Sequence, residues 1–220
     1  MKGGIVRRRA VACLVVALSV LCCVLIAFAF FYARANEGYP AHGIVRYDDT
    51  SLVALRSIGE SGDAEANPEV TLKVEGAAML SADEFMAEFP DYTDRMLSAG
   101  QAQDARFVIV QATVENASEN DARTLLDGAT IQTGSYANGI EYSLYQMLNG
   151  AQASFTFKAH SSSRVYLPYA IYDASFGFNT TWNSIDESSF ELVTALYPDK
   201  EYIDLGVLGN TSLSDLSLKG

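Results

Sequence analysis

The sequence contains few of the side chains that build most metal and redox sites. Its 220 residues include three cysteines and two histidines, and all three cysteines lie within one apolar run between residues 10 and 33. The rest of the chain can form no disulfide, and it offers too few cysteines and histidines for a usual four-ligand zinc site. We predict no metal and no cofactor. An exported domain without cysteine fits a Gram-positive bacterial envelope better than an animal cell surface.

Basic residues are also scarce, and they are unevenly distributed. The chain has 15 Lys and Arg against 27 Asp and Glu, for a net charge of −12. Residues 1–35 carry +5, so residues 36–220 carry −17. Because phosphate binding needs clustered cations, nucleic acid is excluded as a partner. The acidic part should repel anionic lipids and wall polymers, so we expect any charged partner to be cationic or bridged by divalent ions.

One long apolar run is present, since only Ser19 is polar between Ala10 and Ala33. As a helix, these 24 residues would span about 36 Å, compared with roughly 30 Å of bilayer hydrocarbon. Arg7, Arg8 and Arg9 precede the run, and the positive-inside rule keeps such an end in the cytoplasm. The sequence predicts a cytoplasmic tail over 1–9, one transmembrane helix over 10–33 and an extracellular C-terminal domain.

Cleavage of this leader as a signal peptide is the alternative. Ala27–Ala29 and Ala33–Ala35 both have the small residues that flank a cleavage site. The apolar part of a signal peptide usually has only 7–15 residues, so the length favours a retained anchor.

The remaining chain is predicted to form a linker over 34–67, a β domain over 68–205 and a tail over 206–220. The linker is rich in glycine and acidic residues, and its apolar patch at 52–55 fits either a helical turn or an edge strand. From Pro68 onward, apolar and polar residues alternate with period two, as in half-buried strands. The alternating segments are 70–74, 107–115, 155–157, 165–171 and 190–197.

Two segments favour short helices instead. Ser81 and Glu84 have the spacing of a capping box, and Pro90 ends the helix that follows them. The second segment is 140–148, followed by Asn149-Gly150 as a stop signal. Many strands with two short helices, and no regular strand–helix alternation, predict a mainly β, antiparallel sandwich.

Three segments carry a resemblance to a known group of domains: FVIVQATVEN at 107–116, RVYLPY at 164–169 and FELVTALYP at 190–198. They resemble immunoglobulin-like (telokin-like) extracytoplasmic domains of unknown function from Gram-positive bacteria, which often follow a single membrane anchor. The resemblance covers roughly 68–205. It implies an immunoglobulin-like β-sandwich at the cell surface, and it implies no site residue, because that group has no established activity.

No catalytic motif is present: the sequence has no nucleophile elbow, no phosphate-binding loop and no zinc-binding HExxH helix. His160 lies beside Ser161, but neighbours in sequence do not make a catalytic triad, and a polar hairpin loop is the favoured interpretation. Glu119, Asn120 and Asp121 supply hard oxygen atoms that suit calcium, yet the spacing of a calcium loop is missing, so a solvated turn is favoured.

Tyr166, Tyr172 and Trp182 form the candidate interaction surface. The two tyrosines are on the strand face opposite the predicted core, Trp182 is in a polar loop, and such side chains are enriched at interfaces. The favoured hypothesis is a membrane-anchored, extracytoplasmic, non-enzymatic binding module of the bacterial envelope, with an envelope protein or glycan as partner. The alternative is a cell-wall glycan hydrolase with two catalytic carboxylates.

Overall fold

The structure is a computed structural model that describes residues 15, 18–31, 43–58, 64–90, 105–150, 154–176, 182–196, 199–209 and 216. The chain divides into two compact units, Met1–His42 and Gly43–Gly220. In the first unit, residues 18–31 are helical, and the Ser19 hydroxyl donates a hydrogen bond to the Val15 carbonyl at 2.9 Å. The large apolar side chains of this helix are exposed, from 54% for Leu18 to 69% for Phe28.

The predicted membrane span lies only partly within the described residues. None of the helices in the described part of the chain has the length and apolar character needed to cross a membrane. The predicted tail 1–9, and residues 10–14, 16–17 and 32–33 of the predicted span, lie outside the described residues.

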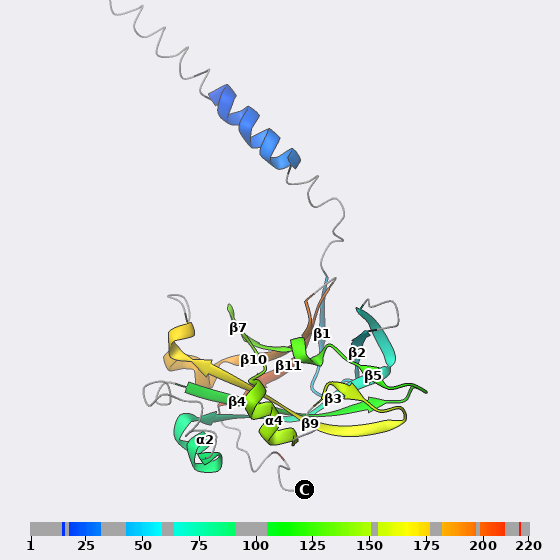
Figure 1. The fold of residues 1–220 in the computed structure, drawn as a ribbon. Coiled ribbons are helices and arrows are strands. Elements are labelled where there is room, and N and C mark those ends of the chain that lie inside the picture. The colour runs from blue at the N-terminus through cyan, green and yellow to red at the C-terminus, as the bar shows by residue number, and fades with distance from the viewer. Residues whose placement is uncertain are drawn as a thin grey trace, which may run out of the picture. The chain divides into compact units, whose positions relative to one another are not determined.

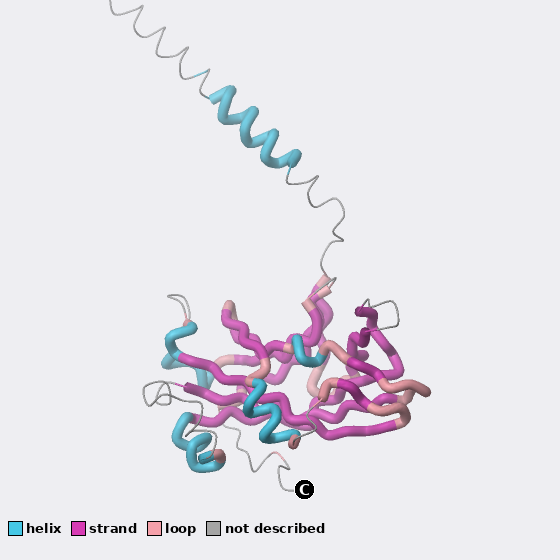
Figure 2. Tube along the Cα trace, viewed as in Figure 1, coloured by secondary structure: helices cyan, strands magenta, loops and turns pink. Residues whose placement is uncertain are grey.

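The second unit is mainly β, which confirms that part of the predicted fold class (Figures 1 and 2). Its strands are β1 (Ile44–Tyr47), β2 (Val53–Ile58), β3 (Ala64–Ser81), β4 (Ala105–Asn116), β5 (Ala122–Arg123), β6 (Thr130–Thr133), β7 (Tyr136–Gly139), β8 (Thr156–Phe157), β9 (Ser161–Tyr172), β10 (Ser189–Ala195) and β11 (Lys200–Val207). They form a five-stranded sheet in the order β1-β11-β10-β6-β7, a four-stranded sheet in the order β2-β3-β4-β9, and the pair β5-β8. Strand β1 pairs with β11 in parallel, which departs from the all-antiparallel prediction, whereas the other paired strands are antiparallel.

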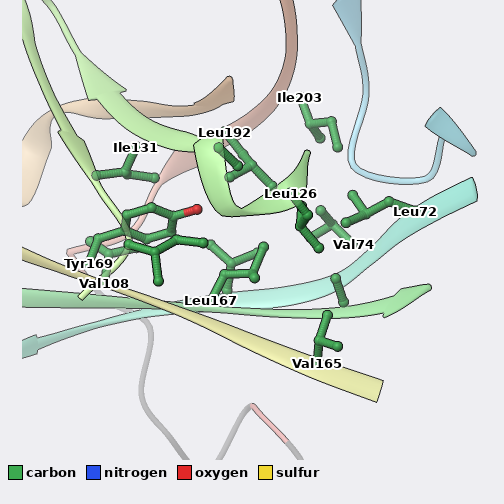
Figure 3. Close-up of a cluster of buried hydrophobic side chains, with 14 of the residues drawn as sticks. Leu72, Val74, Val108, Leu126, Ile131, Val165, Leu167, Tyr169, Leu192 and Ile203 are labelled. Carbon is green, nitrogen blue, oxygen red and sulfur yellow. The ribbon is translucent and has the colours of Figure 1, made fainter. Parts of the chain in front are cut away.

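The two larger sheets share one hydrophobic core. Leu72, Val108 and Leu167 come from the four-stranded sheet, and they lie in the same cluster as Leu192 and Ile203 of the five-stranded sheet (Figure 3). The alternation seen in the sequence over 70–74 and 165–171 accounts for this arrangement, because every second side chain of β3 and β9 faces the core. The second unit therefore contains a complete core of its own.

A second cluster covers the outer face of the four-stranded sheet. Helix α2 (Ala82–Glu88) places Phe85 on Phe107 of β4 with ring centroids 3.7 Å apart, and helix α4 (Tyr142–Asn149) adds Leu144. The predicted capping box is confirmed at the start of α2, where Ser81 and Glu84 bond each other's backbone N–H groups. Strand β4 is thus buried on both faces.

The free edge of β9 is also covered. The Asn149 side chain pairs with the backbone of Tyr166 through both amide atoms, at 2.8 and 2.9 Å. The Glu141 N–H donates to the Pro168 carbonyl, and the Asn138 amide donates to the Ala170 carbonyl. These contacts satisfy backbone groups that an edge strand would otherwise offer to another chain.

The β domain begins earlier than the sequence predicts. Strands β1, β2 and the first residues of β3 all lie within the segment 34–67 predicted as a linker. Strand β1 shows no alternation, because most of it is exposed at the sheet edge, so its pattern carries no strand signal. The patch at 52–55 belongs to an edge strand, not a helical turn. Leu208 and Leu216 of the predicted tail are buried, while 34–42 and 59–63 lie outside the described residues.

Candidate functional site

The three aromatic residues of the candidate interaction surface do not lie together. Tyr166 and Tyr172 are both half-buried on the outer face of β9, beside the second cluster, and six residues of strand separate them by roughly 20 Å. Trp182 begins the 3₁₀ helix η3 (Trp182–Glu187) and packs against the main core. Burial, with a smaller effect of the Glu141 carboxylate, raises the pKa of Tyr172. The structure therefore offers no single aromatic platform built from these residues.

Trp182 takes part in a structural contact between η3 and β4. The Arg106 guanidinium lies 5.3 Å from the Trp182 ring centroid, and it donates hydrogen bonds of 2.9 and 3.2 Å to the two carboxylate oxygens of Asp186. Phe176 packs edge-on against Trp182, and it stacks on Tyr136 at 4.7 Å. A bidentate arginine–carboxylate pair of this kind fixes geometry well, which suits attachment of η3 to the sheet.

The polar turn after β4 is organised by Asn116, which is fully buried. Its Nδ2 donates to the carbonyls of Asn120, Phe157 and Lys158 at 2.9 to 3.1 Å. Its Oδ1 accepts hydrogen bonds from the backbone N–H and the hydroxyl of Ser118. Asn116 thereby joins the turn after β4 to the end of β8.

The acidic residues considered for calcium contact neighbouring polar groups in this turn. Asp121 accepts a 2.6 Å hydrogen bond from Lys158 and another from the Ala159 N–H, and together these lower the pKa of its carboxyl. Glu119 lies 3.1 Å from the ring of His160, an exposed residue in the left-handed backbone region. Within the described ranges there is no group of three or more Asp, Glu, His and Cys side chains suited to a metal ion.

A polar cavity of about 310 Å³ opens beside an irregularity in β3. The pairing of β3 with β4 shifts between Val74 and Gly76, which leaves Glu75 outside the regular register. Lys73 and Glu75 form a 3.2 Å ion pair at this point. The lining residues are Asp49, Thr50, Lys73, Val74, Glu75, Gly76, Ala77, Leu205, Val207 and Leu208. We call this the Glu75 cavity.

A second cavity, of about 350 Å³, lies between the end of β2 and the end of β10. Its walls are mostly apolar, and its polar side chains are those of Arg56 and Thr194. The lining residues are Arg56, Ala64, Leu125, Gly128, Val193, Thr194, Ala195 and Leu196. We call this the Arg56 cavity. A concave, apolar space with a few polar groups is the usual form of a small-molecule site.

Arg56 reaches this cavity from β2 and approaches β11 of the other sheet. Its side chain is 19% exposed, and its Nη2 lies 3.6 Å from a Glu201 carboxylate oxygen, beyond hydrogen-bond length. Its Nε is buried, and within the described part of the chain it has no hydrogen-bond partner. The pKa of Tyr47 is raised by burial and by the Glu201 carboxylate, so Glu201 also interacts with β1.

Sequence reasoning did not identify either cavity. Arg56 and Ala64 belong to the segment predicted as a linker, and Leu125 lies in a segment without alternation. The available signal was a single arginine directly after the apolar run 52–55, because a lone cation among apolar neighbours needs a partner when it is buried. The distant segments that complete the cavity could not be paired from sequence.

Comparison with known proteins gives a family without a known activity. A solved structure described as a functionally unknown protein from Listeria monocytogenes EGD-e is similar with 14% identity and a TM-score of 0.36, over 66% of this chain and 74% of that chain. No curated protein matches. The family described as "Domain of unknown function (DUF5028)" matches residues 44–201, which is more than half of the chain, so the protein belongs to the DUF5028 family.

Proposed function

We propose that this protein is a membrane-anchored module of a Gram-positive cell envelope, which binds a ligand or partner outside the membrane and catalyses no reaction. The apolar run over 10–33, directly after three arginines, is the observation that carries the proposal. The described part of that run supports it, since residues 18–31 form a helix whose large apolar side chains are exposed. Contact with lipid would remove that apolar surface from water.

Strand topology supports an immunoglobulin-like origin for the β domain. In variable-type immunoglobulin domains, strands G, F, C and C′ share one sheet, and A, B, E and D share the other. Here β11-β10-β6-β7 follow the order G-F-C-C′, and the neighbours β4 and β9 take the places of B and E. Helix α4 follows β7, and among the described strands none occupies the D position beyond β9. Domains of this architecture commonly present surfaces for binding, which fits the proposed role by analogy.

Protease treatment of intact cells tests the proposed topology. The full chain with a C-terminal tag, produced in a Gram-positive host, should lose the tag when protease is added to intact cells, while a cytoplasmic marker survives. Replacing Arg7, Arg8 and Arg9 together by Asn should reduce the accessible fraction, whereas replacement by Lys should not, because the orientation depends on positive charge. A tag that is protected in intact cells and digested after lysis would contradict the proposal.

The hydrolase alternative has one specific observation in its favour, which is that Asp49 and Glu75 line the same cavity. Glu75 is already paired with Lys73, so the cavity does not present two unengaged carboxylates. Incubation of the domain with purified peptidoglycan, followed by assay of new reducing ends, distinguishes the two functions. The binding proposal expects no release, whereas release that Glu75→Gln abolishes and Glu69→Gln preserves would establish the hydrolase.

A further inference from the structure

We propose that the Arg56 cavity binds a short acyl chain that carries an anionic head group, with the head group on the Arg56 guanidinium. The inference rests on the proposed binding function and names its ligand class. The cavity volume of about 350 Å³ is near the lower end for small-molecule sites, roughly 300–1,000 Å³, which suits a short chain.

The walls select for an apolar body. Hydrocarbon surface comes from the side chains of Ala64, Leu125, Val193, Ala195 and Leu196, and Gly128 has no side chain that could add polar atoms. Burial of an acyl chain against such walls is favourable, because it removes apolar surface from water.

The mouth of the cavity extends this apolar character to the surface. Leu196, directly after β10, lines the cavity and is 66% exposed. Isolated exposed leucines are ordinary, but this leucine joins the apolar wall of a cavity to the surface. It offers a chain longer than the cavity additional contact.

Arg56 selects for an anionic head group. A guanidinium has five N–H donors arranged to hold a carboxylate or phosphate with two parallel bonds. Glu201 is 3.6 Å from Nη2, and Nε has no hydrogen-bond partner among the residues that the structure describes, so the ion pair with Glu201 leaves arginine donors poorly satisfied there. Nε itself is shielded from solvent, so an oxyanion in the cavity would bond the part of the guanidinium that stays exposed, and hydrogen bonds between charged groups of this kind are among the stronger ones.

Glu201 has a predicted role as a competitor for Arg56. Its carboxylate faces the same guanidinium that the head group would occupy, and it also interacts with Tyr47. Neutralising Glu201 should therefore favour an anionic ligand, whereas a neutral ligand of the same length should respond little. Weaker anion binding after a change at Arg56, together with stronger anion binding after neutralisation of Glu201, is specific to the proposed binding mode.

Calorimetric titration of the 36–220 fragment tests the inference, after circular dichroism has shown that each variant is folded. The probes are decanoate and decyl phosphate, each below its critical micelle concentration, and decanol, below its solubility limit. Both anions should bind, and decanol should bind at least tenfold more weakly. Arg56→Gln should weaken anion binding by about tenfold to a hundredfold, which is the usual value of hydrogen bonds to a charged group. Glu201→Gln should strengthen it, and Arg56→Lys should restore only part of the affinity, because lysine keeps the charge without the planar fork.

A matched pair of leucines controls for nonspecific binding. Leu196→Ser should weaken binding, whereas Leu52→Ser should not, since Leu52 is 64% exposed but does not line the cavity. No anion binding, equal affinity for decanol, or anion binding that is unchanged in Arg56→Gln would each overturn the inference. Preference for one anion over the other identifies the head group as carboxylate or phosphate. Anion binding by a chain that proves not to be exported would refute the envelope function and leave this inference intact. Export of a chain that binds no anion would refute this inference and leave the envelope function intact.

Discussion

Replacement of Asn116 by aspartate should be one of the most destabilising single changes that preserves side-chain shape. The Nδ2 group donates to three carbonyls at 2.9 to 3.1 Å, and an aspartate would place an acceptor oxygen against all of them. The Oδ1 contacts with Ser118 would survive, because a carboxylate still accepts hydrogen bonds. The replacement therefore removes only the hydrogen bonds that the Nδ2 group donates.

The magnitude follows from the number of hydrogen bonds. A buried carbonyl left without a donor costs about 1–3 kcal/mol, and this cost applies to the Phe157 carbonyl, since the carbonyls of Asn120 and Lys158 also accept from the hydroxyls of Ser118 and Ser161. Since Asn116 has no exposed surface, an ionised carboxylate there would carry a further desolvation cost. We expect Asn116→Asp to lower the free energy of unfolding by about 3–5 kcal/mol at pH 7.

The pH dependence separates this mechanism from a general loss of packing. Burial among carbonyl oxygens should raise the pKa of the introduced Asp in the folded state above its unfolded value of about 3.9. The folded variant therefore binds a proton more tightly than the unfolded chain does. Its loss in free energy of unfolding, relative to the wild type, should be smallest below pH 4, and it should grow by up to about 1.4 kcal/mol per pH unit until the pH reaches the folded pKa.

Urea unfolding of the 36–220 fragment between pH 3.5 and 7 measures this deficit against the wild-type curve. Ser118→Ala serves as the control, because it removes one hydroxyl at the accepting side and should cost about 1 kcal/mol without pH dependence. A deficit below 1 kcal/mol for Asn116→Asp, or one that does not vary with pH, would refute the assigned role of the Nδ2 group.

Three further predictions concern the core and its supports. Tyr169→Phe should raise the free energy of unfolding by about 1 kcal/mol in urea titrations, because the buried hydroxyl has no hydrogen-bond partner among the described residues; a loss of 1 kcal/mol would contradict this. Gly209→Ala should cost about 3 kcal/mol or more, since its Cβ would lie 1.8 Å from the Asp186 carbonyl oxygen, whereas Gly139→Ala meets nothing within 4 Å and should cost far less. Burial raises the pKa of Tyr145 to about 12, so its contribution to stability is complete below pH 10 and should fall by about 2 kcal/mol by pH 12; Tyr145→Phe should show a correspondingly smaller fall over that range.

The elements that the sequence predicts well are those with strong local patterns. Strand β4 appears because apolar residues fill one face of the strand over 107–115, and α2 appears because Ser81 and Glu84 form a capping box. Helix α4 starts two residues later than the predicted segment 140–148 and ends one residue later, at Asn149, and Gly150 follows with a positive φ that glycine adopts readily. These features depend on neighbours within a few residues, so local chemistry is sufficient to reveal them.

The features that the sequence does not reveal depend on long-range pairing. Strand β1 exists because it pairs with β11, more than 150 residues later in the chain, and its exposed side chains show no alternation. The Arg56 cavity likewise needs residues from β2, the segment before η1 (Leu126–Gly128) and β10. Because register between distant strands is set by the assembled core, neither feature has a local signature.

The distribution of covered and open surface favours the Arg56 end of the domain for the proposed ligand binding. The outer face of the four-stranded sheet is occupied by α2, α4 and the second cluster, which leaves Tyr166 and Tyr172 as half-buried neighbours of that cluster. The edge of β9 is satisfied by Asn138, Glu141 and Asn149, so it offers little to a partner strand. Among the described residues, the Arg56 cavity combines apolar walls with a buried cation whose donors are incompletely used. Residues 36–220 carry a net charge of −17, so most of their surface should repel an anionic ligand. The Arg56 guanidinium would attract such a ligand to this cavity.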